Sequence, residues 1–122
     1  RRALNVRALT TDSSVLTAWA NDVDYDTVFS RQVEAYGCPG GVLLAISTSG
    51  NSRNVISAAR AAHKRRMSVI GLTGRGGGAL APLCDVLLDV PSSETPRIQE
   101  MHMMVYHYLC EVVECLVDPA EV

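Results

Sequence analysis

A strand, a hydroxyl-rich turn and a helix follow one another near the middle of this chain, and this succession most constrains its fold. Residues 42–46 are an apolar run, as in a strand that is buried on both faces. From residue 55 onward, apolar side chains recur at helical spacing. The turn between these segments carries four hydroxyl side chains, those of Ser47, Thr48, Ser49 and Ser52. We therefore expect a fold in which strands alternate with helices.

This turn suits a bound phosphate group. The first N–H groups of a helix lack intrahelical acceptors, and the helix dipole favours an anion at that end. The turn contains no lysine, so it differs from the lysine-containing loop that binds nucleotides. Neutral hydroxyl donors without fixed cations favour a sugar phosphate. The alternative is a capping role, in which Ser49 or Ser52 caps the helix and Gly50-Asn51 makes the turn.

The remaining segments extend the alternation. Strands are expected over residues 4–9, 42–46, 68–72 and 86–90, and helices over 15–20, 25–36, 52–66 and 96 to about 117. The glycine run 76–78 indicates a flexible loop, followed by at most a short helix over 79–83. Such an order predicts a three-layer α/β sandwich with a mainly parallel sheet and a long C-terminal helix. Ligands of such sheets bind beyond the carboxyl ends of the strands, where the serine turn and Thr73-Gly74 lie.

Composition narrows the class of protein. The chain has 122 residues, enough for one domain over 1–122, and its net charge of −2 gives no electrostatic reason to bind nucleic acid or an anionic membrane. No apolar run approaches the roughly 20 residues that a bilayer span needs. Its four cysteines show no C-x-x-C spacing, which favours reduced core residues of a cytoplasmic protein. Because the chain starts without methionine, we expect further residues before Arg1.

Four blocks of the sequence resemble the sugar isomerase (SIS) domain family, and within it the phosphoheptose isomerases. These blocks are residues 44–52, 20–22, 73–77 and 96–102, and the resemblance covers essentially the whole chain. It implies a flavodoxin-like fold and an aldose–ketose isomerase that converts sedoheptulose 7-phosphate to a heptose 7-phosphate. The product would be a precursor of surface heptose polysaccharide.

The resemblance also implies roles for individual residues. Ser47, Thr48, Ser49 and Ser52 would hold the phosphate, and Asn21, Asp22 and Gln99 would contact the sugar. Gln99 and His107 would bind the family's zinc ion, with His107 also acting as an acid or base. The family carries a further histidine and a catalytic glutamate in an amino-terminal region. We expect that region to be missing here, so this piece would hold about half of the catalytic set.

Plain alternatives remain for several of these residues. His107 lies between Tyr106 and Tyr108 on an apolar helix, so it could be a packed core or interface histidine, although histidine titrates near neutral pH and suits proton shuttling. Asp22 could instead cap the following helix. We interpret His102 as a structural residue that at most supports the residues of the site.

The spacing of Gln99 and His107 argues for an interface. Eight residues on one helix correspond to a rise of about 12 Å, whereas zinc–nitrogen bonds are about 2 Å long. Either the helix is distorted or the two ligands come from different subunits, and we predict the latter. Residues 101–116 are apolar nearly all round, which requires cover on several sides. We expect a homotetramer with a helical-bundle core.

Two functions compete on this sequence. The first is the zinc-dependent isomerase or its carboxyl-terminal portion. The second is a non-catalytic SIS protein that binds a replication initiator as a tetramer, or that senses a sugar phosphate. The presence of His107 and of the intact serine turn favours the enzyme.

Overall fold

The structure, a computed structural model, describes residues 3–117. It contains four α-helices, one 3-10 helix and three strands within that range. In chain order they are α1 (Ser13–Asp22), α2 (Val28–Tyr36), β1 (Val42–Ser47), α3 (Arg53–Lys64), β2 (Ser68–Thr73), η1 (Gly78–Leu83), β3 (Val86–Asp89) and α4 (Thr95–Val117). No helix in this part of the chain is both long and apolar enough to cross a membrane.

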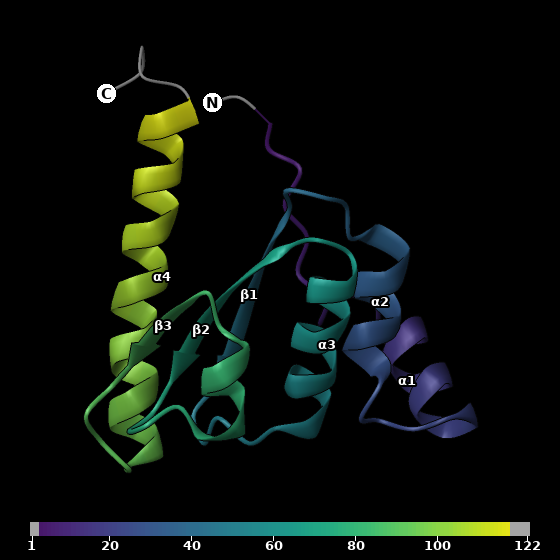
Figure 1. Cartoon of the computed structure of the whole chain (residues 1–122), viewed down its shortest axis with the longest axis horizontal. Coiled ribbons are helices and arrows are strands. Elements are labelled where there is room, and N and C mark those ends of the chain that lie inside the picture. Colours follow the sequence, from purple (N-terminus) through teal and green to yellow (C-terminus); the bar gives the residue numbers. More distant parts are fainter. Residues whose placement is uncertain (1–2, 118–122) are drawn as a thin grey trace.

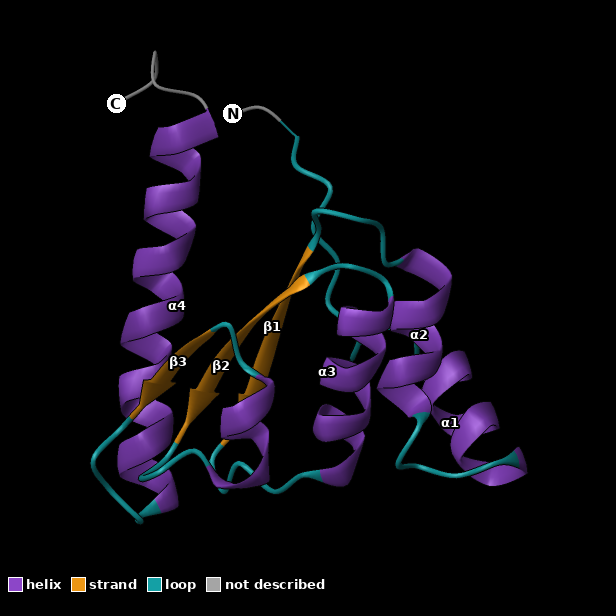
Figure 2. Ribbon diagram, in the orientation of Figure 1, coloured by secondary structure: helices purple, strands orange, loops and turns teal. Residues whose placement is uncertain are grey.

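The three strands form a parallel sheet in the order β1-β2-β3. Ala45 of β1 pairs with Gly71 of β2, and Ile70 of β2 pairs with Val86 of β3. Helices α1, α2 and α3 lie on one side of the sheet and α4 lies on the other, as Figures 1 and 2 show. The predicted three-layer arrangement with a parallel sheet and a long C-terminal helix is therefore confirmed.

The core lies where α3 meets α2 and the sheet. The face of α3 that points there consists of four buried alanines, Ala58, Ala59, Ala61 and Ala62. Ala45 and Val69 from the sheet, Val33 from α2 and Leu80 from η1 complete the cluster. Small side chains let the α3 backbone approach both neighbours closely, and this holds the amino end of α3 beside the end of β1.

The segment 4–9 does not form the strand that its sequence predicts. Residues 3–8 have no regular secondary structure, and the side chain of Val6 is 81% exposed. The segment is held at its end by Gln32, whose buried Nε2 donates to the carbonyl oxygen of Leu9 at 3.0 Å. A groove of about 950 Å³, lined by residues 5–10 on one side and by 41–46 on the other, separates it from β1. A strand needs a neighbour about 4.8 Å away, and within residues 3–117 the segment has none.

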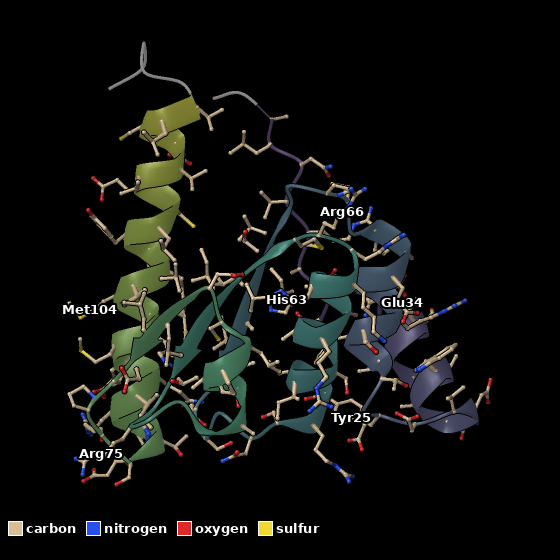
Figure 3. All side chains as sticks on the ribbon, in the orientation of Figure 1. Tyr25, Glu34, His63, Arg66, Arg75 and Met104 are labelled. Atoms are coloured by element: carbon tan, nitrogen blue, oxygen red, sulfur yellow. The ribbon has the colours of Figure 1, made fainter. Side chains whose placement is uncertain are left out.

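Helix α4 leaves most of its apolar surface uncovered. Among its exposed side chains are Met101, Met103, Met104, Tyr108, Val113 and Leu116. Figure 3 shows Met104 pointing away from the sheet. The facing side of the sheet also exposes apolar residues, including Val42, Leu44 and Ile46 of β1. The prediction of a helix that is apolar nearly all round holds, and this single chain does not cover it.

The alanine face of α3 gives a direct test of the packing. We expect Ala59→Leu, at a fully buried position, to lower the free energy of unfolding by about 1–3 kcal/mol, because the larger side chain separates α3 from α2 and the sheet. Ala18→Leu is the matched control on the exposed surface of α1 and should change stability by no more than about 0.5 kcal/mol. Urea denaturation of both variants measures this. Equal losses would contradict the close packing of α3.

Candidate functional site

The serine loop, residues 47–52, joins the carboxyl end of β1 to the amino end of α3. Ser47 is the last residue of β1 and its side chain is only 5% exposed. Because the sheet is parallel, the ends of β1, β2 and β3 all lie at one edge, and Figure 1 shows the first turn of α4 at this edge too. The predicted position of the loop is confirmed.

The amino end of α3 keeps its hydrogen-bond donors free. Ser52 stands at the N-cap position but its hydroxyl makes no cap bond. Its oxygen lies instead 2.8 Å from the hydroxyl oxygen of Ser47. Within residues 3–117, the backbone N–H groups of Arg53 and Asn54 have no acceptor. The capping alternative for Ser52 is therefore wrong, and the helix end can receive an anion.

Ser49 has a local role that leaves its proton available. Its hydroxyl oxygen accepts a hydrogen bond from the N–H of Asn51 at 3.1 Å, and its carbonyl accepts from the Asn51 side chain at 2.9 Å. These bonds shape a tight turn rather than cap α3. Because the Ser49 oxygen accepts in this turn, its O–H can still donate to a ligand.

A glycine loop, residues 76–78, packs against the serine loop. Gly50 has a φ of +65°, and a Cβ built there would lie 2.0 Å from the carbonyl oxygen of Gly77. The N–H of Leu80 donates to the carbonyl of Gly50 at 2.9 Å. The side-chain oxygen of Asn51 accepts from Ala79 at 3.0 Å. From the sequence, this glycine run is predicted only to be a flexible loop. The contact is missed because the spacing of glycines does not indicate a partner 27 residues away.

The end of β2 joins the serine loop to α4. The N–H of Gly74 donates to the carbonyl of Thr48 at 2.9 Å. A Cβ on Gly74 would lie 2.5 Å from Cδ1 of Ile98, a buried residue of the first turn of α4. Gln99 follows Ile98 and is exposed. The structure therefore places the turn that carries Gln99 beside the serine loop.

Asn21 and Asp22 precede the α1–α2 connection, which the ion pair between Asp26 and Arg53 ties to the start of α3. They are the last two residues of α1, which lies beyond α2 as seen from the sheet (Figure 1). The side chain of Asn21 donates to that of Asp22 at 2.8 Å. Asp22 does not cap α2, because the N-cap residue is Thr27 and no side chain makes a cap hydrogen bond there.

His107 lies farther along α4 than the turn that carries Gln99. It lies eight residues beyond Gln99 within one α-helix, a rise of about 12 Å, and its exposed ring packs beside Tyr106 with centroids 5.1 Å apart. Among the described residues, no group of three or more His, Cys, Asp or Glu side chains could hold a metal ion. Gln99 and His107 of one chain do not fit a single zinc ion.

The charged groups near the loop are already paired. Arg53, at the start of α3, makes an ion pair with Asp26 at 2.8 Å, and Arg97 pairs with Glu100 at 2.6 Å. Arg75, labelled in Figure 3, donates to the carbonyl of Pro91 at 3.0 Å. The groups of the serine loop that can receive an anion are therefore neutral hydroxyls and amides.

Cys84 is not a nucleophile of this site. Burial, followed by the carboxylate of Asp85, raises the pKa of the Cys84 thiol. A thiol with a raised pKa stays protonated near neutral pH, and the thiolate is the reactive form. All four cysteines are free. Cys38 and Cys110 are exposed in this chain, so the expectation of core cysteines is wrong for these two.

The fold and the loop together define a parallel α/β domain with an anion-binding turn at the carboxyl edge of its sheet. Comparison with known proteins gives the family. The SIS domain family model matches residues 1–74. The chain belongs to the SIS domain family.

Relatives within this family share more than the domain. Over 114 residues, the chain is 56% identical to a phosphoheptose isomerase of Rhodospirillum rubrum, with 93% of this chain and 61% of the relative covered. It is 57% identical over 119 residues to one of Thiobacillus denitrificans, covering 95% and 60%. The chain thus spans about 60% of the length of these relatives.

Solved structures agree with the fold. Phosphoheptose isomerase GmhA from Neisseria gonorrhoeae is 55% identical, with a TM-score of 0.86 over 88% of this chain and 60% of that one. A phosphoheptose isomerase from Francisella tularensis is 41% identical, with a TM-score of 0.89 over 93% of this chain and 61% of that one.

The contact between the serine loop and the glycine loop can be tested at Gly50. Gly50→Ala should cost about 1–3 kcal/mol of stability for the clash with Gly77, in addition to about 1 kcal/mol for the positive φ. Gly40→Ala is the matched control, because Gly40 also has a positive φ but has open space around it. Thermal unfolding and phosphate-ester titration should show a larger loss for Gly50→Ala in both readouts. Equal behaviour of the two variants would contradict the contact.

Proposed function

We propose that the full-length protein is a phosphoheptose isomerase, which converts sedoheptulose 7-phosphate to D-glycero-D-manno-heptose 7-phosphate. The observation that carries this proposal is the serine loop, whose hydroxyls and free α3 amides suit a phosphate ester. The names of the relatives, at 52–57% identity, support the same substrate. The product would be a lipopolysaccharide precursor, made in the cytoplasm.

In this proposal, the residues of the chain divide between binding and proton transfer. Ser47, Thr48, Ser49 and Ser52 hold the phosphate, while Asn21, Asp22 and Gln99 contact the sugar. The reaction moves a proton between the first two carbons of the sugar through an enediol. His107 carries the proton between the hydroxyl oxygens. The base that takes the carbon-bound proton is the glutamate that the resemblance implies outside these residues.

The distance between Gln99 and His107 supports a site shared between subunits. One regular helix separates them by a rise of about 12 Å, which supports a common site to which a second copy of the chain supplies one of the two. The exposed apolar side chains of α4 provide a surface for such an association. We propose a homotetramer in which Gln99 and His107 of different copies would hold zinc, the family's metal, which would stabilise the negative charge on oxygen in the enediol step.

The alternative is a non-catalytic SIS protein that binds a replication initiator or senses a sugar phosphate. The same serine loop would serve a sensor, so the loop alone does not separate these functions. The relatives support the enzyme, because those compared above are named as phosphoheptose isomerases.

Activity of the full-length protein tests the proposal. We expect turnover of sedoheptulose 7-phosphate that a chelator lowers, and a loss of about 100-fold or more in His107→Ala, the range typical of a removed general acid or base. Cys110→Ala is the control on the same helix, at another exposed position. An inactive wild-type protein would overturn the isomerase, and full turnover by His107→Ala would remove this residue from the mechanism.

Mixing impaired subunits tests the shared site. Gln99→Ala and His107→Ala should each keep only a small residual activity alone, and coexpression of the two should restore part of the lost activity, because some sites then combine an intact Gln99 with an intact His107 from the other copy. Coexpression of a Gln99→Ala/His107→Ala double variant with His107→Ala is the control, because no copy in that mixture carries an intact His107. No recovery in the mixed assembly would contradict a site built across subunits.

A further inference from the structure

Two buried side chains attach α4 to the rest of the chain. Of the α4 residues that the structure describes, Ile98 and His102 are the buried ones. They lie four residues apart, so they share one face of the helix. Ile98 packs against Gly74, and His102 contacts the residue just before it, Thr73. The placement of α4 against the sheet therefore depends on these two contacts at the end of β2.

The contact of His102 is a hydrogen bond to the backbone. Its Nε2 lies 3.0 Å from the carbonyl oxygen of Thr73. A carbonyl only accepts, so Nε2 carries the proton and donates. The ring is 3% exposed, and its other nitrogen, Nδ1, has no partner among the described residues. An unpaired buried acceptor lowers the stability of the folded chain.

Packing alone does not account for a histidine at this position. A leucine would fill the same buried space without an unpaired nitrogen. The carbonyl of Thr73 would also remain bonded, because it accepts from the N–H of Val90 at 3.0 Å. The histidine therefore contributes something that an apolar residue cannot, and the directional bond from Nε2 is that contribution.

The bond controls where the first turns of α4 lie relative to the serine loop. Thr73 ends β2, and the next residue, Gly74, donates to the carbonyl of Thr48 in the serine loop. Gln99 precedes His102 by three residues, so the two are neighbours on the helix surface. A slip of α4 by one residue would rotate this face by about 100° and carry Gln99 away from the loop.

We propose that His102 is a positioning residue whose hydrogen bond to Thr73 sets the rotation and height of α4, so that Gln99 meets the sugar end of a phosphate ester bound in the serine loop. This inference rests on the proposed isomerase function. His102 acts through Gln99 and does not contact the substrate.

Variants of the full-length protein test the bond separately from packing. His102→Leu keeps an apolar filling and removes the bond, whereas His102→Gln keeps a side-chain N–H donor. We expect His102→Leu to unfold at a urea concentration no lower than wild type. Its kcat/KM should fall about ten- to a hundredfold, because a small misplacement of a substrate-contacting group has an effect of this size. Inhibition by inorganic phosphate should stay within about twofold of wild type, and His102→Gln should recover part of the loss.

His63 provides a control for the loss of a bond from a histidine to a backbone carbonyl, at an exposed position. Its Nε2 also bonds a backbone carbonyl, that of Leu83, at 2.9 Å. This bond joins α3 to η1 and does not involve α4 (Figure 3). His63→Leu should therefore leave kcat/KM within about twofold of wild type. An equal loss of kcat/KM in His63→Leu and His102→Leu would mean that the loss comes from a general disturbance of the fold. This result would overturn the proposal.

A double-mutant cycle with Gln99 gives the decisive readout. If His102 acts through Gln99, then Gln99→Ala/His102→Leu loses no more activity than Gln99→Ala alone. Multiplied losses in the double variant would overturn the proposal, as would a fully active His102→Leu or a His102→Gln no better than His102→Leu. An active wild type with any of these results contradicts only this inference, whereas an inactive wild type contradicts the isomerase itself.

Discussion

The backbone contact between Gly50 and Gly77 is the constraint on which the rest of the site depends. The two glycines approach so closely that a side chain at Gly50 would overlap the carbonyl of Gly77. This contact allows the serine loop to turn sharply at the end of β1 and to enter α3 without using Ser52 as a cap. The hydroxyls and the free amides consequently remain available for a ligand. The serine loop can therefore bind a ligand because glycine, which has no Cβ, stands at both positions of this contact.

The sequence predicts the elements of this fold well where the signal is local. Two of these signals are the apolar runs of β1 and β2 and the helical periodicity of α3. They involve residues only a few positions apart, and the structure confirms them. The serine loop is predicted for the same reason. The proposed strand over residues 4–9 fails because a strand is stabilised by a partner that periodicity does not specify. Its pattern is apolar enough, but a groove lies where its neighbour would be.

In the candidate site too, the sequence predicts local features but not the contacts between distant segments. Ser47 to Ser52 are contiguous, so their proximity can be read from the sequence. The packing of residues 76–78 on the serine loop and the bond from His102 to Thr73 join segments more than 25 residues apart. The roles of Asn21, Asp22 and His107 remain predictions, because no contact within residues 3–117 joins these side chains to the serine loop. The distance between Gln99 and His107 follows from helix geometry alone and did not require the structure.

The uncovered surfaces have a common physical meaning. Helix α4 and the side of the sheet that faces it expose large apolar residues, and such surfaces are stable in water only when something covers them. The relatives are longer than this chain. The proposed tetramer, with α4 at its centre, is one way to cover this surface.

A crystal structure of the full-length protein with sedoheptulose 7-phosphate would show where the phosphate binds. We expect the phosphate within hydrogen-bond distance of the Ser47 to Ser52 hydroxyls and of the first amides of α3. A phosphate bound at another place, with the serine loop empty, would contradict this expectation.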